Sequence, residues 1–267
     1  MKKELHWIYK MALFLAMGIV FLALFAPWIA PYDPTAVSTE EILEGMSSSH
    51  WLGTDALGRD ILSRTIYGAR TSVAFAFVAA FCTMFLGLML GLLSGYFGGW
   101  VDRGIQCLVA VFQGLPGMSL MIAVAAILPE NNFRLIIALT LTSWAGFSRI
   151  VRSEVIRIRG EFYMESIKSL GASHGYIVRK YVLPNVLPVV IVLLTLRIGT
   201  SLLSASALSY LGLGVSPPTA DWGVMISDAR TYFRSYPLMM IAPGTGITLF
   251  CLSINLLGDA MRERIRR

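Results

Sequence analysis

Six long stretches without charged side chains constrain this chain more than any other feature of its sequence. They are residues 11–32, 71–101, 104–129, 135–148, 181–196 and 235–258. A helix of about 20 apolar residues crosses the hydrocarbon core of a bilayer. The two shorter runs reach that length if Arg149 and Arg197 lie inside a span or at its edge. Since 56% of the residues are hydrophobic and 14% are charged, the sequence predicts an all-α membrane protein with six transmembrane helices.

The distribution of Lys and Arg predicts how these helices are oriented, because such residues concentrate in cytoplasmic segments. With the N-terminus inside, Arg197 falls within a span and most of the other 21 lie on the cytoplasmic side. The exceptions, which fall outside, are Arg59, Arg64, Arg70, Arg134, Arg230 and Arg234. Both termini and the charged segment 152–184 are therefore predicted to be cytoplasmic. The net charge of +6 follows from this topology and gives no reason to expect nucleic-acid binding.

The charged segment contains EFYMESIKSLGASHGYIVRKYVLP, residues 161–184. Tyr163, Ile167 and Leu170 fall at i, i+4 and i+7, a spacing that predicts the apolar face of a short helix. Gly171 is predicted to end this helix.

A second short helix is predicted to follow. Ser173 is a favourable N-cap for it, and Ile177 and Val182 belong to its apolar side. Leu183 and Pro184 are predicted to break it, because proline has no backbone N–H to donate. The segment is thus predicted to be an amphipathic knob on the membrane surface.

The positions of Glu165, Gly171 and the Leu183–Pro184 pair resemble the EAA loop of ABC-importer permeases. In that family the loop fits a groove on the cytoplasmic ATP-binding subunit. Ser166 and Ile167 stand where the family has two alanines. The alternative is an ordinary amphipathic surface loop. The resemblance implies an ATPase-docking loop made of Tyr163, Glu165, Ile167, Leu170, Gly171, Ile177, Leu183 and Pro184.

The outer segment that precedes the second run contains GTDALGRD, residues 53–60. This density of Gly, Asp and Arg predicts a turn, followed by an amphipathic helix. One face of that helix would carry Ile61, Leu62, Thr65 and Ile66. The spacing of Asp55 and Asp60 does not fit an EF-hand calcium loop.

GTDALGRD resembles a signature of the C-type permease subunit of peptide and nickel ABC importers. The signature residues are Gly53, Thr54, Asp55, Gly58, Arg59 and Asp60. SYLGLGVSPP at 209–218 and NLLGDAMR at 255–262 resemble the same family, so the similarity extends from about Trp51 to the C-terminus. Within it, PTADWGVMISDARTY at 218–232 is more similar to nickel-type subunits than to dipeptide-type ones.

Two of the predicted spans contain helix-packing or helix-bending residues. Gly87, Gly91 and Gly95 form a doubled GxxxG face that lets another helix backbone come close, either in this chain or in a partner subunit. Pro116 lies between two glycines and predicts a kink whose freed carbonyl needs a donor.

Arg197 lies in the middle of the fifth span, where a charge requires a wet cavity or a partner. Pro116 and Arg197 are therefore candidate pathway residues.

The sequence lacks the usual motifs of an enzyme or a metal site. Residues 171–175 fit G-x-S-x-G, but that hydrolase elbow needs a preceding strand, and the chain has only three histidines, His6, His50 and His174. There is no GxxxxGK[ST] loop to cradle ATP phosphates and no HExxH or His/Cys cluster to ligate a metal. We expect no catalytic residues, no metal ligands and no bound cofactor.

The resemblance implies a permease subunit of a binding-protein-dependent importer with the type I ABC importer fold, in the bacterial inner membrane. Its expected partners are a second homologous permease, two ATP-binding subunits that bind ATP and Mg, an extracytoplasmic binding protein and membrane lipid. Residues 1–70 would supply the first helix and an external loop, and residues 71–267 the permease core with its coupling loop at about 152–184. Nickel or a metal chelate is the first predicted substrate and a dipeptide or oligopeptide the alternative.

Two functions of other classes remain as alternatives. An autonomous secondary transporter would call for inverted repeats or an intramembrane acid relay, and neither is visible in the sequence. A membrane hydrolase would depend on Ser173.

Overall fold

The computed structural model describes residues 2–131 and 133–265. Over these residues the chain is helical, and its one strand-like pairing is an isolated bridge between Thr54 and Asp60. The elements in order are α1 (Lys2–Leu24), α2 (Ala26–Ile29), α3 (Ile61–Phe97), α4 (Gly99–Gly114), α5 (Gly117–Ile127), α6 (Phe133–Arg159), α7 (Phe162–Ser169), α8 (His174–Ile177), the π-helical turn η1 (Val178–Val182), α9 (Leu183–Tyr210), α10 (Trp222–Ala229) and α11 (Leu238–Ile265).

Five helical stretches of the described chain are long and apolar enough to cross a membrane. They are Trp7–Leu24, Ile61–Phe97, Phe133–Arg159, His174–Tyr210 and Leu238–Glu263. The pair α4 and α5 makes a sixth if it counts as one span, although the two helices are bent by 95° at their junction. The junction contains Pro116, so the predicted kink is confirmed as a complete break. Six predicted spans thus correspond to five continuous spans and one broken span.

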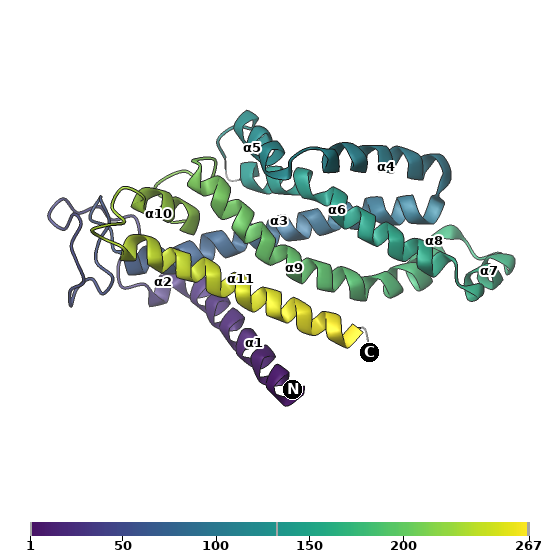
Figure 1. Cartoon of the computed structure of the whole chain (residues 1–267), viewed down its shortest axis with the longest axis horizontal. Coiled ribbons are helices and arrows are strands. Elements are labelled where there is room, and N and C mark those ends of the chain that lie inside the picture. The colour runs from purple at the N-terminus through teal and green to yellow at the C-terminus, as the bar shows by residue number, and fades with distance from the viewer. Residues whose placement is uncertain (1, 132, 266–267) are drawn as a thin grey trace.

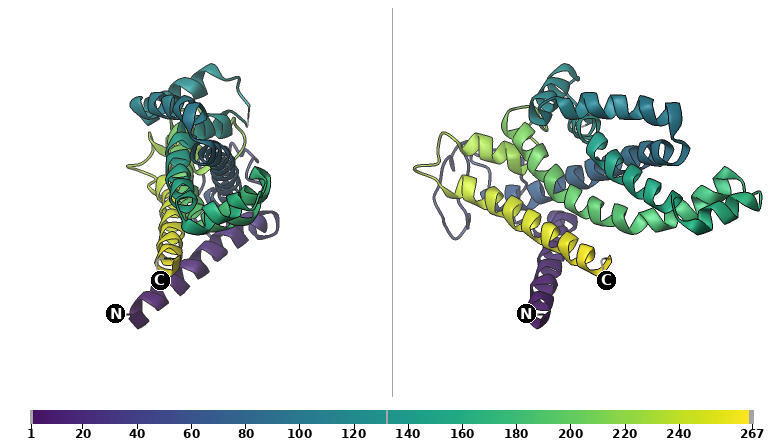
Figure 2. Two further views of the ribbon diagram at one scale, coloured as in Figure 1. Left: turned by 90° about the vertical axis from the view of Figure 1, so that its right-hand side faces the viewer. Right: turned by 45° about the vertical axis from the view of Figure 1, so that its right-hand side comes forward.

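The helices form an elongated bundle with distinct ends (Figure 1). α3, α6, α9 and α11 run along the long axis, while α1 leans away from them toward its N-terminus in every view (Figures 1 and 2). The loop of residues 30–60 and α10 lie at one end, and α7 and α8 lie at the other (Figure 1). We call these the outer end and the inner end. The GTDALGRD stretch and the stretch that resembles the EAA loop therefore lie at opposite ends of the bundle.

Among the described elements, α3 and α6 share the most extensive helix contact, and glycine makes their close approach possible. A Cβ added at Gly91 would lie 2.7 Å from the carbonyl oxygen of Ser148 and 2.7 Å from the Cβ of Val151. Added Cβ atoms at Gly87 and Gly95 would lie 2.8 Å from the Cβ atoms of Phe147 and Val155 on the same helix. The sequence left open whether the GxxxG face packs on a helix of this chain or on a partner subunit. The structure shows that it packs on α6 of this chain.

The helix predicted directly after GTDALGRD is confirmed, because α3 begins at Ile61. This helix continues without interruption to Phe97 and so includes the second predicted span. Its first turn buries Ile61, Ser63 and Arg64, whereas Leu62, Thr65 and Ile66 are only partly buried. The predicted face was wrong because Arg64 counts as polar, yet it is buried beside carboxylates.

The helix break predicted at Leu183 and Pro184 is also wrong. Residues 174–210 form one continuous helical span, and Pro184 lies in the first turn of α9. The π-helical turn η1 immediately precedes it. A wider turn of this kind absorbs a change in the hydrogen-bond ladder, so the missing N–H of proline does not end the helix.

We expect Gly91→Ala to destabilise the bundle by about 1–3 kcal/mol, because the added methyl meets backbone that cannot move aside. The measurement is the apparent Tm of the detergent-solubilised protein. Gly104→Ala on α4 is the matched control, since no described atom lies within 4 Å of a Cβ added there. Alanine in place of that glycine should be neutral or stabilise by up to about 1 kcal/mol. Equal Tm values for the two variants would contradict the close packing of α3 on α6.

Candidate functional site

The inner loop, α7 to η1, is anchored by buried apolar side chains. Met164, Ile177 and Val182 are fully buried. They extend a cluster that also contains Leu88 and Val151 of α3 and α6. The loop is therefore packed onto the helices that cross the membrane and does not hang free.

The apolar face of α7 differs from the predicted one. Tyr163 is 41% exposed and Leu170 is 87% exposed, whereas Met164 is buried and Ile167 is partly buried. The prediction missed this because α7 has only eight residues, and two apolar stripes of similar quality overlap in so short a helix. Glu165 and Gly171, which the sequence predicts to belong to a docking loop, are also exposed.

The turn between α7 and α8 was predicted correctly from local chemistry. Gly171 has a φ of 81°, a left-handed conformation that favours glycine. Ser173 caps α8 by accepting a hydrogen bond from the backbone N–H of Tyr176. The Nδ1 atom of His174 lies 3.0 Å from the hydroxyl oxygen of Tyr96 and ties this turn to the end of α3. Ser173 and His174 thus have structural contacts, and no strand precedes them in the described chain.

A second tie at the inner end was not predicted. Arg152 of α6 donates from Nε and Nη2 to the two carboxylate oxygens of Asp102, both at 2.6 Å, and Ser94 of α3 also donates to Asp102. A bidentate pair of this kind fixes orientation as well as distance. It joins α3, α4 and α6 beside the inner loop. No motif or spacing in the sequence predicts that these two residues, 50 positions apart, form a pair.

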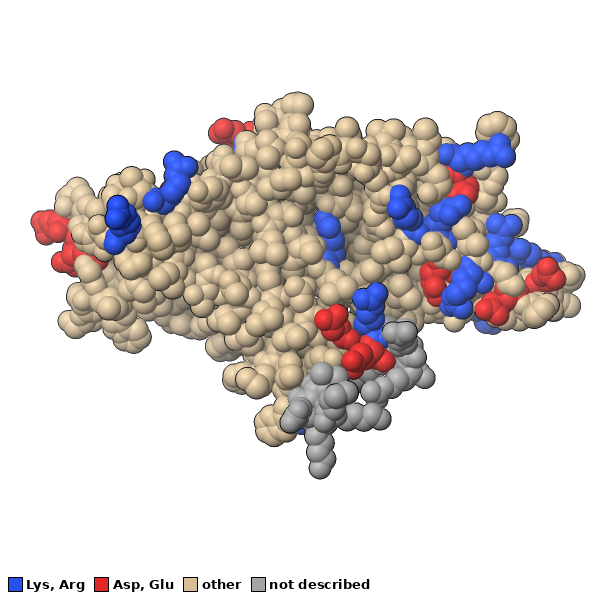
Figure 3. All heavy atoms as spheres, in the orientation of Figure 1, with Lys and Arg blue, Asp and Glu red and all other residues tan. Residues whose placement is uncertain are grey.

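Figure 3 shows where the charged side chains lie on one face of the molecule. They gather at the inner end and, in smaller number, at the outer end, and the surface between is mostly uncharged. This banding is what a bundle needs if its middle lies in hydrocarbon.

At the outer end, most of the GTDALGRD signature serves to fold the loop. Gly53 and Gly58 have φ values of 79° and 71°, and a Cβ at either position would meet a backbone oxygen at 2.4 Å or less. Thr54 accepts from the backbone N–H of Glu44 at 2.8 Å. Asp60 caps α3 by accepting from the backbone N–H of Ser63 at 2.7 Å. These four signature residues are therefore structural.

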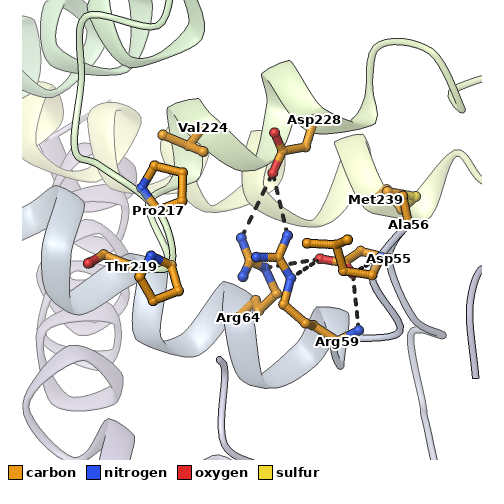
Figure 4. Close-up of a pocket in the computed structure, with 11 residues that line it drawn as sticks. Asp55, Ala56, Arg59, Arg64, Pro217, Thr219, Val224, Asp228 and Met239 are labelled. Atoms are coloured by element: carbon orange, nitrogen blue, oxygen red, sulfur yellow. Dashed lines mark hydrogen bonds and ion pairs between the residues drawn. The ribbon is translucent and has the colours of Figure 1, made fainter. Parts of the chain in front are cut away.

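The remaining signature residues, Asp55 and Arg59, line a cavity of about 260 Å³. The Nε of Arg59 donates to Asp55 at 2.7 Å, and the Nε of Arg64 lies 3.4 Å from the same carboxylate oxygen. Asp228 of α10 lies on the opposite side, 3.7 Å from Arg59 and 4.0 Å from Arg64. Figure 4 shows both guanidinium groups between the two carboxylates. We call these four residues the outer charge cluster.

Sequence reasoning missed Asp228 and Arg64 as members of this cluster. Arg64 was counted only as an outside charge, and Asp228 stands 164 residues further along the chain. A signal existed, because Asp228 lies in the stretch 218–232 that resembles the same family as GTDALGRD. That stretch also supplies Asp221, which caps α10 and accepts from the hydroxyl of Ser72 at 2.7 Å.

The two predicted pathway residues lie away from the outer charge cluster. Arg197 is partly buried near the middle of α9. Among the described residues, its Nε atom has no hydrogen-bond partner and its guanidinium forms no ion pair. Pro116 lies at the exposed corner between α4 and α5. Arg134, which the sequence placed outside, is buried and donates to the carbonyl of Gly214 at 3.0 Å.

The described residues contain no group of three or more His, Cys, Asp or Glu side chains that could hold a metal ion. The outer charge cluster offers two carboxylates, but two guanidinium groups neutralise them. Among the described residues, the hydrogen bonds at the two ends do not join a nucleophile to a base and an orienting acid.

The chain is thus a multi-helix membrane protein with a helical loop anchored at one end and a folded, charged loop at the other. This chain belongs to the family of binding-protein-dependent transport system inner membrane components, whose sequence model matches residues 87–267. It is therefore a permease subunit of an ABC importer of the inner membrane. Membership implies ATP-binding partner subunits and a substrate-binding protein, and the relatives are transport components without catalytic activity of their own.

Curated relatives extend over nearly the whole chain. The glutathione transport system permease protein GsiD of Shigella flexneri serotype 5b is 42% identical over 261 residues, which are 97% of this chain and 86% of that protein. The protein of the same name from Escherichia coli O157:H7 is 41% identical over the same lengths.

Solved structures show the same fold at low sequence identity. A chain of the inward-facing MetNI methionine ABC transporter matches with a TM-score of 0.61 and 19% identity, over 78% of this chain and 98% of that one. A chain of an amino acid ABC transporter with histidines matches with a TM-score of 0.58 and 17% identity, over 76% and 94%. The predicted type I importer fold agrees with these neighbours.

We expect the outer loop to become more stable as the pH falls, because of His50. Burial opposes its protonation, but its hydrogen bond to Asp60 at 2.9 Å and the charges of Asp60 and Glu41 outweigh burial and raise the pKa of His50 above 6.5. A raised folded-state pKa contributes stability that is complete below the unfolded value and is lost as the pH rises through the folded value.

The measurement is hydrogen exchange of residues 41–60 at about pH 5.5 and about pH 8, corrected for intrinsic exchange rates. Protection should be higher at the lower pH, and His50→Gln should remove the difference. An unchanged pH dependence in that variant would assign the effect to another group.

Proposed function

We propose that this chain is the permease subunit of an importer of short peptides. The single observation that carries this proposal is the 42% identity to a glutathione permease over 97% of the chain, since glutathione is a tripeptide. Nickel, the first substrate predicted from the sequence, has no support among these relatives, and the peptide alternative fits them better. The nickel-type similarity of residues 218–232 rested on few residues.

We also propose the topology in which both termini and the inner loop are cytoplasmic. The positive-inside distribution supports it, and so does the location of α7 and α8 at the end opposite the GTDALGRD loop (Figure 1). In this arrangement the outer loop faces the binding protein. The division into residues 1–70 and a permease core of 71–267 remains part of the proposal.

In the proposed mechanism, two partner ATPases bind ATP and Mg and close on the inner loops of this chain and of a second permease. Phe162 and Leu170 are 92% and 87% exposed. Exposure of such apolar side chains to water is unfavourable, and contact with a partner removes it. The buried Met164 and Ile177 then transmit the motion to α6 and α9 as a rigid-body rotation. ATP hydrolysis thus drives opening of the pathway without any nucleotide site in this chain.

The pathway proposal keeps Arg197 and Pro116. A lone guanidinium in the middle of a span is stable only beside an anion, a partner or water. The break at Pro116 leaves backbone carbonyls that need a donor from a neighbouring helix or from water. Both residues suit the face that this chain turns toward a second permease.

We expect Leu170→Asp to reduce ATP-driven uptake and co-purification with the ATPase subunits by about tenfold or more, the usual cost of a central interface residue. The fold should be unaffected, because Leu170 is exposed. Met46→Asp is the matched control, since Met46 is an exposed apolar residue of the outer loop, and it should leave co-purification unchanged. Normal uptake and co-purification with Leu170→Asp would exclude this docking surface.

We expect a proteoliposome-reconstituted transporter, with its binding protein outside and ATP inside, to accumulate labelled glutathione or another tripeptide. Excess unlabelled dipeptide or tripeptide should compete, and nickel chloride, alone or with a chelator, should not. ATP-dependent accumulation of nickel with no effect of peptides would restore the nickel function. Accumulation driven by an ion gradient without ATPase subunits would indicate a secondary transporter.

A further inference from the structure

The outer charge cluster has more hydrogen-bond donors than its carboxylates use. Each guanidinium carries five N–H donors, but within the described chain Arg59 donates only from Nε, to Asp55, and Arg64 only from Nη1, to the carbonyl of Pro34. Both side chains are more than nine-tenths buried, with 8% and 2% exposed. Two buried cations therefore direct unused donors toward the cavity that they line.

The two carboxylates of the cluster are held very differently. Asp55 accepts from the backbone N–H groups of Leu57 and Arg59 at 2.8 and 3.0 Å, in addition to the guanidinium of Arg59. Asp228 lies 3.7 and 4.0 Å from the two arginines, too far for a hydrogen bond. Asp55 is thus a fixed part of the loop, and Asp228 is a loosely held counter-ion.

The surroundings of Asp228 agree with this difference. Its side chain is 46% exposed, so it has a free route into solvent. Burial raises the pKa of Asp228 above its ordinary value, and the opposing attraction of Arg64 and Arg59 is the weaker effect. The carboxylate of Asp228 therefore stabilises the arginine pair less than a hydrogen-bonded anion would.

Apart from Thr219, the other walls of the cavity are apolar. Pro217, Val224 and Met239 line it beside the charged groups (Figure 4). A guanidinium fork binds the two oxygens of a carboxylate in parallel, while walls of this kind accept a small side chain. The combination suits the C-terminal end of a short peptide.

We propose that the outer charge cluster is an entry site for the substrate, in which the C-terminal carboxylate of a short peptide displaces Asp228 from Arg59 and Arg64. This proposal rests on the proposed import of peptides and adds a site and a recognised group to it. No covalent bond changes, and the exchange replaces one carboxylate by another at the same cations. Asp228 then keeps the empty site electrically neutral. Because it competes with the peptide carboxylate for the two arginines, it also weakens peptide binding enough for release.

The test compares uptake of labelled trialanine with uptake of its C-terminal amide by the complete reconstituted transporter. In the wild type, the amide should have the higher KM, because it cannot replace Asp228. Asp228→Asn removes the competitor, so the KM for trialanine should fall by about fivefold, the scale of one partly exposed ion pair. The KM for the amide should not change.

Two further variants separate this exchange from a general effect of charge. Asp228→Glu keeps the carboxylate and should restore the wild-type ratio of the two KM values. Asp33→Asn removes an exposed carboxylate of the outer loop that does not line this cavity, and it should leave the ratio unchanged.

Each outcome has one meaning. If Asp228→Asn shifts both KM values equally, or neither, while the wild type takes up trialanine, the carboxylate site is wrong and peptide import stands. If the wild type takes up neither peptide, the proposed function itself fails.

Discussion

The close approach of α3 and α6 is the constraint on which the rest of the structure depends. It exists because Gly91 and its neighbours at i−4 and i+4 present bare backbone to the facing helix, and in lipid such packing replaces the hydrophobic effect as the force between helices. α3 starts directly after the GTDALGRD loop and ends beside the inner loop, to which α6 leads directly. One tightly packed pair therefore connects the two ends, and relative motion at either end must move this pair as a unit.

The features that the sequence predicted correctly depend on neighbouring residues. The length of an apolar run sets whether it can cross a membrane, the bend at Pro116 follows from a missing N–H, and the turn at Gly171 with its cap at Ser173 follows from local backbone preferences. None of these needs knowledge of what lies across the fold. The number and order of spans, and the position of the inner loop between the fourth and fifth, were accessible for the same reason.

The features that it did not predict depend on distant residues. The exception is Pro184, which was expected to end a helix, although the π-helical turn directly before it redistributes the hydrogen bonds. Met164 and not Leu170 faces the bundle, because Met164 packs in a cluster with residues of α3 and α6. Arg64 is buried because Asp55 and Asp228 approach it from two other segments. Such contacts leave no spacing pattern in the chain.

The corner between α4 and α5 has a consequence for how the subunit is made. Leu115 and Pro116 are exposed there, and a helix break that meets hydrocarbon leaves carbonyl groups without donors, each costing several kcal/mol. A solitary copy whose corner met hydrocarbon would bear that cost in full, and the second permease proposed above would remove it by covering the corner. With such a partner, balanced synthesis of the two proteins, which adjacent genes on one messenger RNA provide, would follow from the geometry of this corner.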